Sequence, residues 1–141
     1  MPNKFLLALF LVVLSGGSVF AQTLAAPKHH AVFQMNEPES NEWGALFAHL
    51  TNLRNAFESE GGVEVEVVFF GPRLGMLYKA TSPYGDMMKR LAAEGVKFVA
   101  CQNSMRGRRI KTEDLFSFAL QVDSGVAEIV RKQEAGWAYV K

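Results

Sequence analysis

The strongest constraint on the fold is a repeated change of hydrophobic period along the chain. Short apolar runs rich in β-branched and aromatic residues alternate with stretches whose apolar residues recur every three or four positions. We expect strands at 29–36, 63–71, 96–101, 119–123 and 137–140, helices at 41–59, 84–95 and 123–136, and short helical segments at 74–80 and 112–118. Alternating strands and helices form βαβ units with a parallel sheet between two helical layers. The sequence therefore predicts a three-layer, flavodoxin-like α/β domain with a mostly parallel sheet of about five strands.

Three local patterns make this prediction more specific. Ser40 or Asn41 can cap the start of the first long helix, and the pair Gly61-Gly62 ends it. The last helix is expected to begin at a cap formed by Asp123 or Ser124. Its residues expected to face the core are Val126, Ile129 and Val130. The segment 102–111, QNSMRGRRIK, is expected to be a polar loop.

The first 21 residues have the pattern of an export signal. Lys4 precedes an apolar run, 5–14, and the sequence Val-Phe-Ala at 19–21 resembles a cleavage site. A retained membrane anchor is the alternative, but about ten apolar residues fall short of the roughly twenty that span a bilayer. We therefore expect a signal peptide at 1–21, a flexible leader at 22–28 and one domain at 29–141, without stable insertion in a membrane.

Composition limits the partners. The chain has 15 Lys and Arg against 14 Asp and Glu, a net charge of +1. Binding to nucleic acid usually requires a strongly basic surface, so we do not expect a nucleic-acid partner.

Cys101 is the main candidate for chemistry. It ends the third expected strand, and parallel α/β sheets bind ligands beyond the carboxyl ends of their strands. It is the chain's only cysteine, so it cannot form an internal disulfide. The cations that follow it are Arg106, Arg108, Arg109 and Lys111, and nearby cations lower the pKa of a thiol. The alternative is that Cys101 is a small buried core residue and that the basic segment is solvated.

Other candidate sites are weaker. The histidines His29, His30 and His49, together with Cys101, have donor atoms for copper or zinc, but adjacent residues of a strand point to opposite faces. The turn GPRLG at 71–75 can surround an anion with backbone amides but lacks a nucleotide-binding pattern. No metal site and no cofactor is expected.

Four segments in order resemble one known family. They are VEVEVVFFGPR, GVKFVACQNSMR, IKTEDL and VDSGVAEIVRKQEAGWAYVK, and they are similar to the DsrE/DsrF-like family of sulfur-relay proteins. The resemblance implies a flavodoxin-like fold, a homotrimer or homohexamer, and a cysteine that carries sulfane sulfur as a persulfide. Cys101 matches that cysteine. On this basis Asn103, Ser104, Arg106 and Arg73 are the candidate substrate-binding residues.

The export signal separates this chain from the family's cytoplasmic members. We therefore expect a periplasmic sulfur carrier that exchanges sulfur with donor and acceptor proteins or with small sulfur species. This hypothesis predicts an accessible Cys101 thiol. The alternative is a non-catalytic oligomeric binding or scaffold module of the same fold, in which the thiol is only packed. A periplasmic metal-binding protein that uses His29, His49 and Cys101 is a third hypothesis.

Overall fold

The computed structural model describes residues 27, 29–35 and 43–141. The expected signal peptide lies outside these residues, as do the expected leader apart from Pro27 and the expected cap at Ser40 or Asn41. None of the helices in the described ranges is both long enough and apolar enough to cross a membrane.

The described residues form one five-stranded sheet in which all four pairings are parallel. The strands are β1 (His29–Gln34), β2 (Val63–Phe69), β3 (Lys97–Cys101), β4 (Leu120–Val122) and β5 (Ala138–Val140), in the spatial order β4-β3-β2-β1-β5. This arrangement confirms the expected flavodoxin-like α/β fold. The chain adds strands in one direction from β1 to β4 and then returns to place β5 beside β1.

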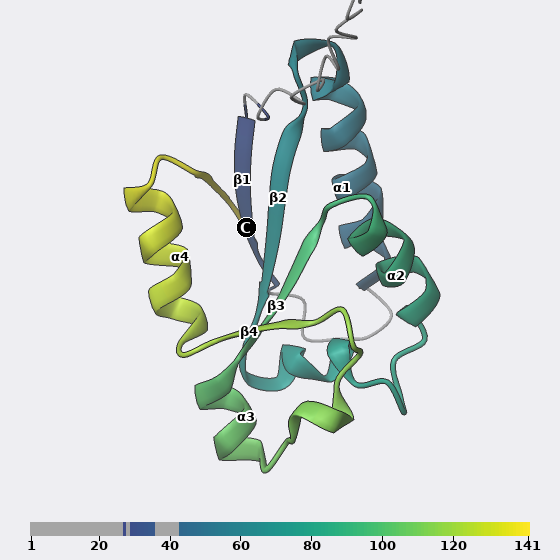
Figure 1. The fold of residues 1–141 in the computed structure, drawn as a ribbon, viewed down its shortest axis with the longest axis vertical. Helices are drawn as coiled ribbons and strands as arrows, with labels where there is room; N and C mark the ends of the chain where they lie inside the picture. The colour runs from purple at the N-terminus through teal and green to yellow at the C-terminus, as the bar shows by residue number, and fades with distance from the viewer. Residues whose placement is uncertain (1–26, 28, 36–42) are drawn as a thin grey trace, which may run out of the picture.

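The helices lie on both faces of the sheet (Figure 1). They are α1 (Trp43–Phe57), α2 (Gly85–Ala93), α3 (Gln102–Arg108) and α4 (Gly125–Glu134), with 3₁₀ segments η1 (Glu58–Glu60), η2 (Gly71–Leu77) and η3 (Thr112–Asp114). Helices α1 and α2 cover one face, and α4 lies on the other. Right-handed crossovers explain this division, because the connection from β4 to β5 runs in the opposite direction to the earlier connections.

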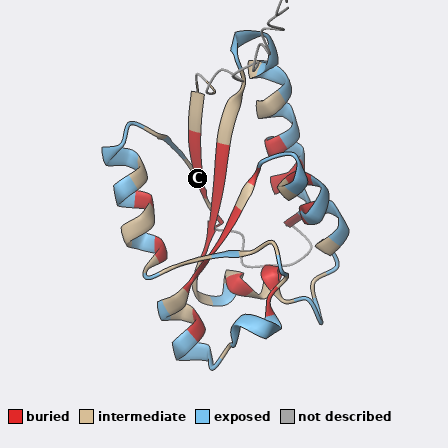
Figure 2. Ribbon diagram, viewed as in Figure 1, coloured by how far each residue is buried: buried red, intermediate tan, exposed pale blue. Residues whose placement is uncertain are grey.

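The two faces carry cores of very different size. Twenty of the described residues form the buried cluster on the α1 and α2 side, and Val65, Phe69 and Phe98 are among them. Within the described part of the chain, the cluster beneath α4 has three buried members, which are Val32, Val68 and Ile129. Figure 2 shows buried residues concentrated in the strands and on the inner side of the helices. The α1 side therefore contributes most of the apolar burial that stabilises the fold.

Some local predictions are confirmed. Ser124 is the N-cap of α4, and its hydroxyl accepts a hydrogen bond from the Ala127 amide at 3.4 Å. Gly61 ends η1 in a left-handed conformation with φ of 99°, as expected of a helix stop. The short helical segment expected at 74–80 instead begins at Gly71 and ends at Leu77.

The prediction of a loop at 102–111 is wrong, because 102–108 form α3. Cys101 has extended backbone angles and occupies the N-cap position, and Arg109 ends the helix with a left-handed φ of 58°. Met105 is the only buried residue of α3. A single buried residue leaves no 3.6-residue apolar period, so the pattern resembles a polar loop.

The predicted inward face of α4 is only partly correct. Ile129 is buried, but Val126 and Val130 are 60% and 48% exposed. The positions that face the sheet are Gly125, Ile129 and Lys132, which recur at helical spacing. Because two of these three residues are a glycine and a lysine, hydrophobicity alone identifies the wrong side of the helix.

Candidate functional site at the end of strand β3

Cys101 lies at the carboxyl edge of the sheet, as predicted from the sequence. It is the last residue of β3 and pairs in register with Val122 of β4. Helix α3 begins at the next residue, and α4 begins three residues after Val122. The starts of two helices therefore meet at the thiol, with their free backbone amides directed toward it.

Hydrogen-bond donors surround the sulfur. Burial acts to raise the pKa of the Cys101 thiol, but hydrogen bonds from the Gly125 amide, the Ser104 hydroxyl and the amides of Ser104 and Asn103 outweigh it. The net effect is a thiol pKa below its ordinary value. Donors of this kind stabilise the thiolate, which is the nucleophilic form of cysteine.

A second contact orients the Ser104 hydroxyl. The Gly71 amide donates a hydrogen bond to Ser104 Oγ at 2.8 Å. Because that contact occupies a lone pair of the hydroxyl, its proton is free to point toward the sulfur. Gly71 has a φ of 57°, a conformation that favours glycine. The turn after β2 thus supports the site through Ser104.

Gly125 allows α4 to approach the thiol closely. A Cβ atom at this position would lie 3.2 Å from Cys101 Cβ, 3.1 Å from Val68 Cγ1 and 3.0 Å from Phe70 Cδ1. These separations are shorter than ordinary carbon contacts. Position 125 therefore requires glycine if its amide is to reach the sulfur of Cys101.

The prediction of an accessible thiol is wrong for this conformation, because Cys101 is only 4% exposed. The strand that ends at Cys101 is buried along its last four residues, and α4 closes over the sulfur from the other side. The surrounding donors favour a thiolate, whereas the burial limits access by reagents and substrates.

The other predicted site residues have different positions. Ser104 contacts the sulfur, and Asn103 contributes its backbone amide. The Asn103 side chain is exposed and accepts a hydrogen bond from Arg106, so these two side chains pair on the surface of α3. Arg73 lies in η2, two residues after Gly71. The donors that lower the thiol pKa are therefore amides and a hydroxyl rather than the basic side chains of 106–111.

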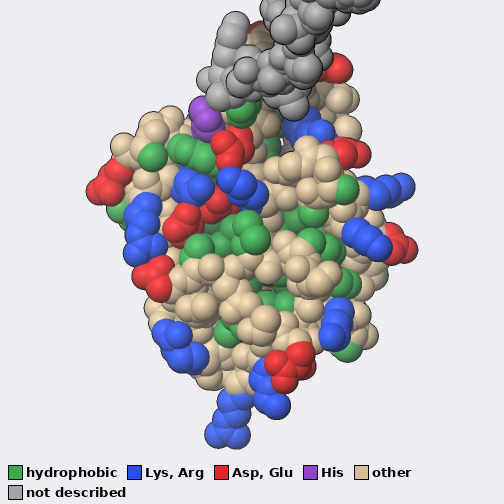
Figure 3. All heavy atoms as spheres, in the orientation of Figure 1, with side chains coloured by type: hydrophobic (Ala, Val, Ile, Leu, Met, Phe, Trp, Pro, Cys, Tyr) green, Lys and Arg blue, Asp and Glu red, His purple; other side chains and the backbone are tan. Residues whose placement is uncertain are grey.

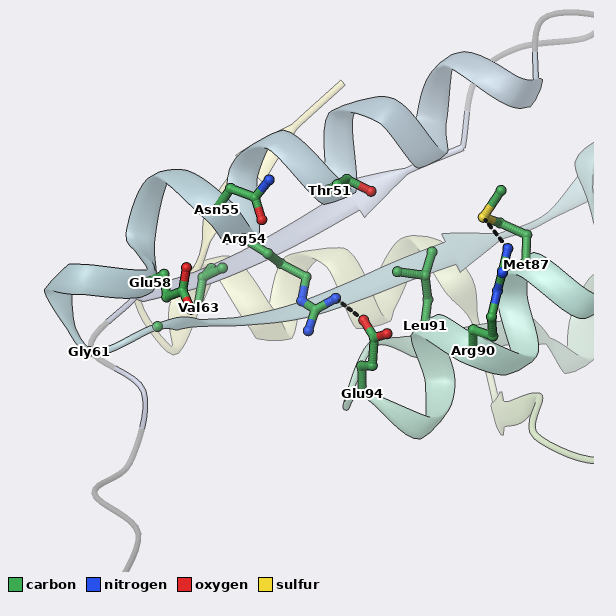
Figure 4. A pocket seen from close by; sticks show the side chains of 11 residues that line it. Thr51, Arg54, Asn55, Glu58, Gly61, Val63, Met87, Arg90, Leu91 and Glu94 are labelled. Carbon is green, nitrogen blue, oxygen red and sulfur yellow. Dashed lines mark hydrogen bonds and ion pairs between the residues drawn. The ribbon is translucent and has the colours of Figure 1, made fainter.

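A large pocket lies at the opposite end of the sheet. It has a volume of about 830 Å³ and lies between α1 and α2, where β2 begins. In Figure 4, Arg54 reaches across to Glu94, and Arg90 approaches the sulfur of Met87. Ligands of parallel α/β sheets bind at the carboxyl ends of strands, so this pocket at the amino ends is a weaker candidate than Cys101.

The structure does not bring the predicted metal donors together. Within the described residues, no three histidine, cysteine, aspartate or glutamate side chains form a group that could hold a metal ion. His29 stacks on Phe57 and approaches Glu60, and His49 lines a small pocket beside the end of β1.

A sequence model of the DsrE/DsrF-like family matches residues 28–141. The chain belongs to the DsrE/DsrF-like family. The match includes every strand and helix of the fold, as well as Cys101 and the residues that surround it. No curated protein matches this DsrE-like chain.

Two solved structures resemble this DsrE-like protein. MTH1491 from Methanobacterium thermoautotrophicum, a protein of unknown function, is 32% identical, with a TM-score of 0.74 over 79% of this chain and 97% of its own. The ychN protein from E. coli is 18% identical, with a TM-score of 0.59 over 82% of this chain and 98% of its own. The second likeness concerns the fold alone.

Sequence reasoning named Gly71 only as part of a possible anion-binding turn, and it missed Gly125 at the DsrE-like site. Gly71 lies two residues after β2 in the segment GPR, and Gly125 lies three residues after β4 in the segment DSG. A glycine at such a position is a signal for close backbone approach. The sequence does not show that both segments approach the same sulfur atom.

Proposed function

We propose that this protein is a periplasmic sulfur carrier that accepts sulfane sulfur on Cys101 as a persulfide and passes it to a partner. The observation that carries the proposal is the ring of four hydrogen-bond donors that lowers the pKa of the thiol at the sheet's carboxyl edge. Family membership supports a sulfur-relay type of protein. The partners are sulfur donor and acceptor proteins or small sulfur species.

The transfer needs no redox partner. The Cys101 thiolate attacks the outer sulfur of a donor persulfide or polysulfide, and a new S–S bond forms as the donor's S–S bond breaks. The rest of the donor leaves with the electron pair of the broken bond, as a thiolate from a persulfide or as a shorter polysulfide anion, and the outer sulfur stays on Cys101. Attack on that sulfur by an acceptor thiolate repeats the exchange and regenerates Cys101.

The exported location rests on the sequence pattern of residues 1–21. A carrier in the periplasm meets small sulfur species and exported partners rather than tRNA. The homotrimer or homohexamer belongs to the same proposal. Its support is the set of exposed apolar side chains on β4 and α4, which are Leu120, Val126 and Val130.

The alternative function is a non-catalytic oligomeric module of the same fold. The 4% exposure of Cys101 favours it, because a thiol that is only packed needs no route to solvent. The two functions differ in whether sulfur ever reaches Cys101.

The decisive experiment is intact-mass spectrometry of the wild type and of Cys101→Ser after incubation with polysulfide. The serine variant is a matched control, because it replaces the sulfur atom with oxygen and keeps the size of the side chain similar. We expect a one-sulfur adduct on the wild type that a reducing agent removes and that Cys101→Ser lacks. Circular dichroism checks that both proteins are folded. A folded wild type that stays unmodified over a range of polysulfide concentrations would favour the scaffold module.

A further inference from the structure

Helix α4 is held to the sheet by few apolar contacts. It is the only described helix on its face of the sheet, and the buried cluster beneath it contains Val32, Val68 and Ile129, flanked by partly buried Phe70 and Trp137. The cluster on the other side has twenty buried members. Regions with little buried apolar surface open at a lower free energy than the rest of a fold. By this measure α4 detaches more easily than α1 and α2.

A buried ion pair replaces further apolar packing under α4. Glu66 lies on the central strand β2 and is only 3% exposed, and its Oε2 is 2.8 Å from Lys132 Nζ of α4. Its other oxygen, Oε1, is buried and has no hydrogen-bond partner among the residues that the structure describes. A buried pair with an unsatisfied oxygen contributes less to docking than well-packed apolar side chains in the same volume.

The same helix covers the thiol. Gly125, the first residue of α4, lies against Cys101 and donates its amide to the sulfur. Cys101 is only 4% exposed, so almost none of it is in contact with solvent. A reagent or sulfur donor therefore needs an element to move before it can reach the sulfur.

We propose that α4 is a lid over Cys101, and that the buried Glu66–Lys132 pair keeps its docking weak enough for the helix to lift as a unit. The lid is bounded by Ser124, the N-cap of α4, and by Gly136, which follows the helix and has a left-handed φ of 88°. These are the two points where the chain would bend as α4 lifts. Lifting α4 removes both the cover and the Gly125 amide from the sulfur. This inference concerns access to the thiol, and it holds or fails separately from persulfide carriage.

The charge on Glu66 gives the lid a defined pH dependence. Burial raises the pKa of the Glu66 carboxyl, and the hydrogen bond from Lys132 only partly opposes this effect. When the lid opens, Glu66 enters water and its pKa falls toward the ordinary value. Protons therefore bind the closed form more tightly, so acid closes the lid and rising pH opens it.

Other charges share this face of the sheet. The charged and titratable groups around Glu66 are Lys132 and Glu128 from α4, Lys97 from β3, Glu64 from β2 and His30 from β1. Glu128 opposes the ionised form of Glu66, and Lys97 favours it, each more weakly than Lys132. The direction of the pH dependence therefore follows Glu66 and Lys132.

The test is the rate at which a small disulfide reagent modifies native Cys101. The chain's only cysteine reports on a single site. Rates are divided by the thiolate fraction, measured from the ultraviolet absorbance of the thiolate, so that they report access rather than ionisation. All proteins are compared at one concentration.

Two changes at the ion pair are expected to act in opposite directions. Lys132→Met can still pack an apolar side chain against Trp137, but it removes the cation that contacts both Trp137 and Glu66, so the corrected rate should rise about tenfold or more. Glu66→Leu combined with Lys132→Met replaces both charges with apolar groups, so the corrected rate should fall roughly tenfold and lose its pH dependence. If Lys132→Met does not fold, the double variant still tests the proposal.

Val65→Ala is the matched control, because Val65 is a neighbour of Glu66 on β2 that belongs to the larger core. It lowers global stability without touching α4, so the corrected rate should stay within about twofold of the wild type. Three results would each overturn the lid: a wild-type rate equal to that of a free thiol, a control that accelerates as much as Lys132→Met, or a double variant that is not slower.

Discussion

At the scale of single residues, the reactivity of Cys101 depends on groups that have no charge. The donors to its sulfur are three backbone amides and the Ser104 hydroxyl, and Gly71 orients that hydroxyl. A backbone amide cannot be removed by changing its own side chain. It can be displaced, and Gly125 is the position where the surroundings are tight enough for an added methyl group to do so.

We predict that Gly125→Ala raises the pKa of Cys101 and lowers stability. The new Cβ would meet Phe70 at 3.0 Å and Val68 at 3.1 Å, so the start of α4 must shift away from the sulfur. Overpacking of this kind costs about 1–3 kcal/mol of unfolding free energy. Chemical denaturation and a titration of thiolate absorbance measure the two effects.

The control is Gly107→Ala, which lies in α3 with open space around its Cβ position. It should raise the free energy of unfolding by about 0.5–1 kcal/mol, because alanine is a better helix former than glycine. The pKa of Cys101 should not change. Equal behaviour of the two variants would contradict the role of Gly125 as a close-contact residue.

At the scale of the element, a salt bridge joins Asp123, which precedes α4, to Arg131 in the last turn of the helix. Arg131 donates from Nη1 to Asp123 Oδ1 at 2.8 Å and from Nη2 to Oδ2 at 3.0 Å. The Asp123 carbonyl also accepts the Asn103 amide at 3.2 Å, which links the start of α4 to α3. The position of Asp123 therefore affects two helices that border the thiol.

We predict that Asp123 titrates with a pKa of about 2, because the hydrogen bonds from Arg131 hold its carboxylate ionised. Since this pKa is depressed, the pair's contribution to stability is present above the ordinary value of 3.8 and is lost as the pH falls toward 2. Asp123 and Arg131 are both exposed, so solvent reduces this contribution.

Carbon-13 NMR of the Asp123 carboxyl measures this titration directly. Arg131→Gln should return the pKa toward 3.8, whereas Arg90→Gln on the distant helix α2 should leave it depressed. An unchanged titration in Arg131→Gln would show that the charge pair does not form in solution.

At the scale of the whole molecule, the two faces of the sheet have different roles. The larger cluster stabilises the fold, and the face under α4 carries the thiol, the buried ion pair and a small apolar cluster. Hydrophobic side chains are visible across the face drawn in Figure 3, with charged side chains of both signs around them. Val126 and Val130 are exposed one helical turn apart on α4, and Leu120 is exposed on the edge strand β4. Such exposed apolar groups are typical of interaction surfaces.

We predict that the protein assembles into a homotrimer or homohexamer through this surface. Val126→Asp combined with Val130→Asp should shift the mass measured by light scattering toward a single chain, because each charge would have to be buried in the interface. Met87→Asp is the control, since Met87 is a similarly exposed apolar residue on α2. A wild type that already has the mass of one chain would contradict the predicted assembly.

The pattern of residues along the chain was enough to predict a mostly parallel sheet, the order of strands and helices along the chain and the position of Cys101 at the carboxyl edge of the sheet. These properties follow from the hydrophobic period, which is local, and from the shared direction of parallel strands. Only the tertiary structure showed that Cys101 is covered, that Gly125 donates to it and that Gly71 orients Ser104. Those contacts join segments more than twenty residues apart, so no local pattern encodes them. For the same reason the inward side of α4 was not predicted correctly. Gly125 and Lys132 face the sheet because they contact Cys101 of β3 and Glu66 of β2, which are distant in the sequence.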